Sequence, residues 1–123
     1  MGYYLKIRKD FFNNEAIRII SKLTEGRTSI YIYIRLLVYS VDDNGIISYQ
    51  ADKEKLFIKQ LAKEFSVTPT EFKNAINILS KYELVERFYD HTYSEAYLRM
   101  PYVAENRGIE TNLFKRIGGN KND

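Results

Sequence analysis

Polar side chains recur at helical spacing between residues 69 and 81, opposite the apolar residues Phe72, Ile76 and Leu79. Asparagine can pair with the edge of adenine through two hydrogen bonds, and lysine can contact guanine or phosphate. The pattern therefore predicts a helix with one buried side and one side that can enter the major groove of DNA. The same residue types are also ordinary on any solvent-exposed helix. The candidate DNA-binding residues on this helix are Thr70, Lys73, Asn74, Asn77 and Lys81.

A predicted β-hairpin follows this helix and carries further candidates for contact with DNA. Its strands cover residues 84–89 and 96–100, and the polar loop 90–95 joins them. A hairpin in this position can reach a phosphate group or an adjacent minor groove. The candidate residues are Arg87 and Arg99 on the strands and Tyr93 at the tip.

The segments before helix 69–81 are predicted to hold it in place. Thr68 is the expected N-cap, and Glu71 completes a capping box with it. A second helix over residues 53–65, which we expect Asp52 to cap, lies one short turn earlier and presents an apolar side to it. Two helices joined by a tight turn and followed at once by a hairpin are typical of a winged helix-turn-helix.

The N-terminal half is predicted to be mainly helical. Apolar residues repeat at helical spacing over residues 15–24, and Gly26 is expected to end that helix in the left-handed conformation. Residues 28–41 are rich in β-forming side chains and fit either a buried strand or a buried helix. We favour a helix, capped by Thr28 or Ser29, because the apolar run is long for one strand.

The remaining segments complete one domain with a mainly α fold and a small β-hairpin, an α+β arrangement. Residues 46–49 are predicted to form a short strand, and residues 3–7 form either an edge strand or an extended arm. We expect the winged helix-turn-helix domain to cover residues 1–104. Residues 105–123 are polar and contain glycine, so they are expected to form a flexible basic tail.

The sequence contains few of the residues and motifs that an enzyme or a metal site requires. It has no cysteine and a single histidine, His91, which falls in the predicted hairpin loop. It contains no phosphate-binding loop and no nucleophile elbow, and its carboxylates are scattered. We therefore expect no catalytic residue, no metal and no cofactor. The longest apolar run, residues 30–41, is too short to cross a bilayer, and no signal peptide is evident, so no contact with a membrane is expected.

Several segments resemble the N-terminal domain of phage replisome organiser proteins. The most specific is Tyr4-Leu5-Lys6-Ile7-Arg8-Lys9-Asp10-Phe11-Phe12, and residues 61–64 and 79–85 look like the helix-turn-helix of that family. The resemblance implies a winged-helix fold related to DnaD-like primosome proteins and favours a helix over residues 28–41. It also implies a role in phage or prophage DNA replication. The chain departs from the family pattern at Glu83, where glycine is usual.

These observations predict a protein that binds double-stranded DNA in the cytoplasm of a bacterial host cell. The net charge of +3 permits such binding without requiring it. Two alternatives remain open, which are a transcriptional regulator and an assembly module that self-associates or holds replication proteins. Tyr3, Tyr4, Phe11 and Phe12 are expected to pack on the core, but they also fit an aromatic arm that docks on a second subunit.

Overall fold

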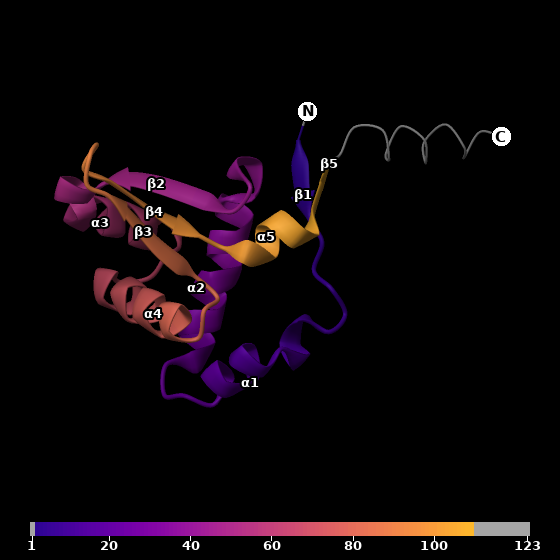
Figure 1. Ribbon diagram of the computed structural model, residues 1–123. Coiled ribbons are helices and arrows are strands. Elements are labelled where there is room, and N and C mark those ends of the chain that lie inside the picture. Colours follow the sequence, from indigo (N-terminus) through magenta and orange to yellow (C-terminus); the bar gives the residue numbers. More distant parts are fainter. Residues whose placement is uncertain (1, 110–123) are drawn as a thin grey trace.

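Helices dominate the fold, and two small antiparallel sheets complete it (Figure 1). The structure, a computed structural model, describes residues 2–109. This arrangement confirms the predicted α+β class. The helices are α1 (Glu15–Ser21), α2 (Gly26–Tyr39), α3 (Glu54–Glu64), α4 (Pro69–Lys81) and α5 (Pro101–Asn106). The strands are β1 (Tyr3–Leu5), β2 (Ile46–Gln50), β3 (Glu86–Asp90), β4 (Glu95–Arg99) and β5 (Arg107–Ile109).

Helix α2 lies at the centre of the molecule and packs against α1 and α4. Its side chains Ile32, Tyr33, Leu36 and Leu37 are buried, as expected for a helix that other elements cover on several sides. The prediction of a helix rather than a strand for this segment is therefore confirmed. The predicted caps are wrong, because the helix begins earlier, with Glu25 as its N-cap.

Gly26 has a different role from the predicted one. Helix α1 already ends at Ser21, and Gly26 is the first residue of α2 instead of a left-handed residue that ends α1. A Cβ atom at position 26 would overlap the backbone carbonyl oxygen of Ile20. Glycine is therefore required here because α1 and α2 approach each other closely.

Helices α3 and α4 pack against each other through the turn at residues 65–68, where Ser66 has a φ of 59°. The predicted capping box at the start of α4 is confirmed. The Glu71 amide donates to the Thr68 hydroxyl at 3.1 Å, and the Thr68 amide donates to the Glu71 carboxylate at 2.9 Å. The predicted cap of α3 is wrong, because Asp52 lies in a 3₁₀ turn and the residue before α3 makes no side-chain cap.

The predicted hairpin is confirmed and belongs to a three-stranded sheet with the order β2-β4-β3. Asp90 pairs with Glu95, so the loop covers residues 91–94 and is shorter than predicted. The predicted strand at 46–49 is also confirmed, as β2, and pairs with β4. The inner face of the sheet buries Ile47, Ala96 and Leu98.

Strands β1 and β5 form a separate two-stranded ribbon, which pairs Tyr3 with Ile109. Residues 3–7 thus contain the predicted strand. The flexible tail predicted to start at residue 105 does not start there, because residues 105–109 belong to α5 and β5. The rest of that tail, residues 110–123, lies outside the described part of the chain.

The two phenylalanines after this ribbon differ in their surroundings. Phe11 packs into the core as predicted, with 3% of its surface exposed. The expected packing of Phe12 is wrong, because 58% of its surface is exposed. Phe12 instead places its ring edge-to-face against Phe11, with a centroid distance of 4.9 Å.

Candidate nucleic-acid interface

The outer face of α4 carries the polar residues that the sequence pattern places there. Its opposite face is buried against α2 and α3 through Phe72, Ala75, Ile76 and Leu79. The helix is therefore held firmly while its polar side faces solvent. The five predicted residues on this exposed side are Thr70, Lys73, Asn74, Asn77 and Lys81.

Arg87 joins the hairpin to this face of α4. Its register partner on β4 is the buried Leu98, so Arg87 lies on the inner face of the sheet, toward the helices. The guanidinium donates a hydrogen bond of 2.7 Å to Oδ1 of Asn77. Two of the predicted site residues are thus in direct contact, and the amide of Asn77 is oriented before any ligand arrives.

A small cavity of about 100 Å³ lies beside this contact, between α3, α4 and the sheet. Tyr49 stacks on Phe57 in its wall, with the ring centroids 4.1 Å apart. Burial raises the pKa of the Tyr49 hydroxyl, the nearby Glu54 carboxylate raises it further, and the charge of Arg87 opposes them. Arg87 therefore interacts with Asn77 of α4 and lies close to Tyr49 of β2. Through these contacts it links the hairpin to the helix.

Arg99 lies on the other face of the sheet, so the structure does not bring it to α4. It pairs in register with Glu86, and the two side chains form an ion pair. Phe88 and Tyr97 stack on the same outer face, with centroids 4.8 Å apart. Arg99 therefore lies on the face of the sheet away from the exposed side of α4.

Three further candidates, Asn74, Lys81 and Tyr93, have different neighbours in the structure. The side-chain amide of Asn74 donates to the Glu25 carboxylate at a long distance of 3.5 Å. The Lys81 ammonium lies 5.6 Å from the centre of the Tyr82 ring. Tyr93 is 76% exposed at the hairpin tip, and a hydrogen bond of 2.9 Å from the Ala51 amide to the Ser94 carbonyl joins this tip to the 3₁₀ turn that precedes α3.

Helix α3 and the residue before it add cations that are not among the DNA-binding residues predicted from the sequence. Lys53 and Lys55 are exposed and flank the start of the helix, close along the chain to Ala51 and hence to the hairpin tip. Lys59 and Lys63 continue the row at intervals of four residues. The four-residue spacing is visible in the sequence, whereas the closeness of the start of this row to the hairpin depends on the pairing of β2 with β4 and on the Ala51–Ser94 hydrogen bond.

Within residues 2–109, no cluster of three or more His, Cys, Asp or Glu side chains is arranged to hold a metal ion. A membrane-spanning helix is likewise not found in this part of the chain, since none of its helices combines the necessary length and apolar character.

A family model described as the N-terminal phage replisome organiser matches residues 4–107. The chain belongs to this family. The match covers nearly all of the described structure and includes both α4 and the hairpin. Membership supports a role related to phage replication and partners related to replication. Neither a curated protein nor a solved structure matches the chain significantly.

Proposed function

We propose that residues 26–100 form a winged helix-turn-helix that binds double-stranded DNA during phage replication. In this proposal α4 enters the major groove and the β3–β4 hairpin is the wing. The observation that supports it best is the exposed polar face of α4, which α3 supports from behind and the Arg87–Asn77 hydrogen bond joins to the hairpin.

The contacts within the free protein define what each asparagine can offer to a base. Oδ1 of Asn77 already accepts from Arg87, so its Nδ2 is the group available to donate to an acceptor such as N7 of a purine. Asn74 makes only a long hydrogen bond to Glu25, which a base edge can replace at small cost. Asn74 is therefore the better candidate for a contact that uses two hydrogen bonds.

Cations around this helix would supply the contacts with phosphate. Lys73 and Lys81 lie on the exposed side of α4, and Lys53 and Lys55 lie at the start of α3. In helix-turn-helix proteins the first helix crosses the sugar–phosphate backbone, which places such lysines beside the DNA. These residues are expected to add affinity without sequence preference.

Binding can be tested by fluorescence anisotropy with a duplex selected from a random pool and with a random duplex. If about five cations meet phosphates, the plot of log affinity against log salt concentration should have a slope of about −4.5. Asn74→Ala should weaken binding to the selected duplex by about 1–3 kcal/mol and leave the random duplex nearly unaffected. Gln60→Ala, on the exposed surface of α3, is the matched control.

Two outcomes would contradict the proposal. One is a salt slope near zero, which would mean that phosphates are not bound. The other is an equal loss of affinity on both duplexes for Asn74→Ala, which would remove the assignment of base contacts to α4.

A further inference from the structure

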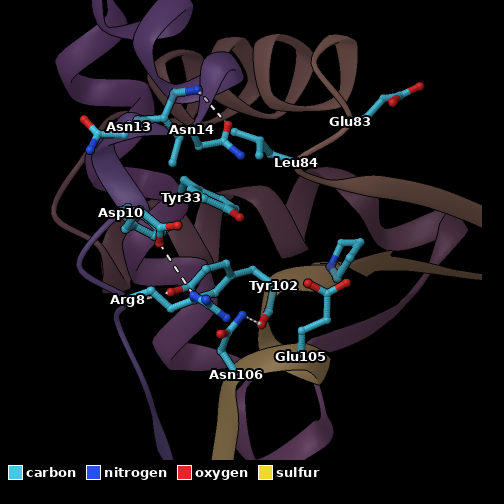
Figure 2. A pocket seen from close by; sticks show the side chains of 13 residues that line it. Arg8, Asp10, Asn13, Asn14, Tyr33, Glu83, Leu84, Tyr102, Glu105 and Asn106 are labelled. Carbon is cyan, nitrogen blue, oxygen red and sulfur yellow. Dashed lines mark hydrogen bonds and ion pairs between the residues drawn. The ribbon is translucent and has the colours of Figure 1, made fainter.

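A larger cavity, of about 450 Å³, lies on another part of the molecule (Figure 2). Its walls come from the segment before α1, from α1, α2 and α5, and from the connection between α4 and β3. None of the candidate DNA-binding residues on α4 or the hairpin lines it. Its volume falls within the range of about 300–1,000 Å³ that is usual for ligand sites.

Three aromatic side chains contribute to the wall of this cavity. The ring of Phe11 stacks on Tyr33 at a centroid distance of 6.1 Å and meets Tyr102 edge-to-face at 5.2 Å. The faces of aromatic rings attract cations through their quadrupole. Phe11 and Tyr33 are buried and stacked on each other, so the partly exposed Tyr102 offers the ring on which a cationic ligand with an apolar stem can lie.

The hydroxyl group of Tyr33 points into the cavity (Figure 2). The side chain is 1% exposed, and burial raises the pKa of the hydroxyl above its ordinary value, so the group keeps its proton. It makes no hydrogen bond to any group within residues 2–109. The hydroxyl oxygen is open to the cavity, so a ligand there can form the hydrogen bond that no described residue provides.

The charged groups around the cavity are mainly acidic. Among the described residues that line it, Asp10, Glu83 and Glu105 contribute carboxylates, and Arg8 contributes the single cation. Arg8 is already engaged with Asp10, at 3.5 Å between Nε and Oδ1. Glu83 and Glu105 have no ion pair with another described residue, so the net charge of the wall attracts a cation and repels phosphate.

We propose that this cavity receives an arginine side chain from a peptide segment of a partner protein. The planar guanidinium can lie on the Tyr102 ring, donate to the Tyr33 hydroxyl and reach the carboxylates at the same time, which the compact ammonium of lysine does less well. Exposed apolar residues beside the cavity fit the residues that flank this arginine. Ile7 is 50% exposed next to Arg8, and Phe12 is 58% exposed against Phe11.

The first test uses the full chain and N-acetyl-arginine-N-methylamide as the probe, with backbone amide shifts followed by NMR. Saturable shifts are expected at Phe11, Tyr33, Tyr102 and Glu105. The citrulline analogue, which has the same shape without the charge, should bind about tenfold more weakly. Equal binding of both probes, or shifts confined to other surfaces, would overturn the proposal.

Substitutions in the cavity test which side chains bind the arginine probe. Tyr33→Phe and Glu105→Gln should each weaken the arginine probe by about tenfold, because the first removes a hydrogen-bond acceptor of the guanidinium and the second removes a negative charge beside it. Glu105 is exposed, so its variant is expected to keep the fold even if Tyr33→Phe loosens the core. Glu95→Gln, in the three-stranded sheet, is the matched control and should bind as the natural chain does. Unchanged affinity in Glu105→Gln would contradict the charge argument.

A further comparison identifies the source of the arginine. A capped Leu-Arg-Leu peptide should bind more tightly than the single residue, and Phe12→Ala should remove this gain alone. If sedimentation shows a dimer that Glu105→Gln dissociates, the occupant is a second copy of the chain and the partner assignment is wrong. If Lys115→Gln with Arg116→Gln strengthens binding of the probe, the occupant is the chain's own C-terminal segment, which also overturns it.

Discussion

The guanidinium of Arg87 donates a 2.7 Å hydrogen bond to the side-chain oxygen of Asn77 and so connects β3 to the exposed side of α4. Arg99, on the neighbouring strand, lies on the opposite face of the sheet and pairs with Glu86. Two arginines that look equivalent in the sequence therefore have different surroundings. Only Arg87 lies near the helix that we propose to bind DNA.

Replacement of these two arginines should separate their roles. Arg87→Gln is expected to weaken binding to all duplexes and to make the salt slope smaller by up to about 1, because it removes both a positive charge beside the proposed interface and the hydrogen bond that joins the hairpin to α4. Arg99→Gln serves as the control of equal charge change and should leave the slope as it was. Anisotropy titrations at four salt concentrations measure both, and an equal effect of the two variants would place the interface elsewhere.

Loss of the N-cap should destabilise the fold without touching the DNA-binding side chains. Thr68→Ala removes the acceptor for the Glu71 amide and should lower the free energy of unfolding by about 1 kcal/mol. Thr70→Ala, two residues on and exposed, should change it by less than about 0.5 kcal/mol. Urea unfolding followed by circular dichroism gives both values. A stability loss as large for Thr70→Ala would mean that the cap is not the cause.

An added methyl group at Gly26 should be costly. In Gly26→Ala the new Cβ would overlap the Ile20 carbonyl oxygen, and α1 and α2 would have to move apart. We expect a loss of about 1–3 kcal/mol in the free energy of unfolding, as for other overpacked sites. Arg27→Ala, at the next and exposed position, should be nearly neutral. The prediction fails if the melting temperature of Gly26→Ala equals that of the natural chain.

Burial of the Tyr33 hydroxyl should make stability fall in alkaline solution. The folded-state pKa is raised above the ordinary value of 10.0, chiefly by burial and further by Tyr102 and Glu105. The unfolded chain therefore loses this proton at a lower pH than the folded chain does. The contribution of Tyr33 to the free energy of unfolding is complete below pH 10 and decreases as the pH rises above 10. The slope from this residue is about 1.4 kcal/mol per pH unit.

The variant Tyr33→Phe has no such proton and should show a shallower decline. Urea unfolding between pH 8 and 11 gives the free energy of unfolding of both proteins. In the difference between the two values, the effects of all other titrating residues cancel. Parallel curves for the two proteins would show that the hydroxyl is not buried in the folded state.

Local patterns in the sequence predicted most of the elements. The capping box of Thr68 and Glu71 fixes the start of α4, and the length of the apolar run identifies α2 as a helix. The role of Gly26 could not be predicted in this way, because it depends on how closely two helices approach. The cap expected at Asp52 failed because residues 51–53 form a 3₁₀ turn that continues from β2.

The candidate site was predictable only in part. The outer face of α4 follows from helical periodicity alone, since Phe72 and Leu79 define the buried side. The face on which Arg99 lies depends on the register of the hairpin, and a shift of one residue would reverse it. That register depends on the four-residue loop 91–94, whose length the polar composition of residues 90–95 does not determine. The large cavity joins segments distant in sequence, so no local pattern indicated it.

The ribbon of β1 and β5 has a mechanical consequence. Its strands are antiparallel, so Tyr3, the first residue of β1, pairs with Ile109, the last residue of β5 (Figure 1). A pulling force applied at these two points would break the residue pairs one after another, as in unzipping, and would meet little resistance. The segment from Lys6 to Asp10 would come under tension next, so traction on the chain ends would reach the rim of the large cavity before it reached α4.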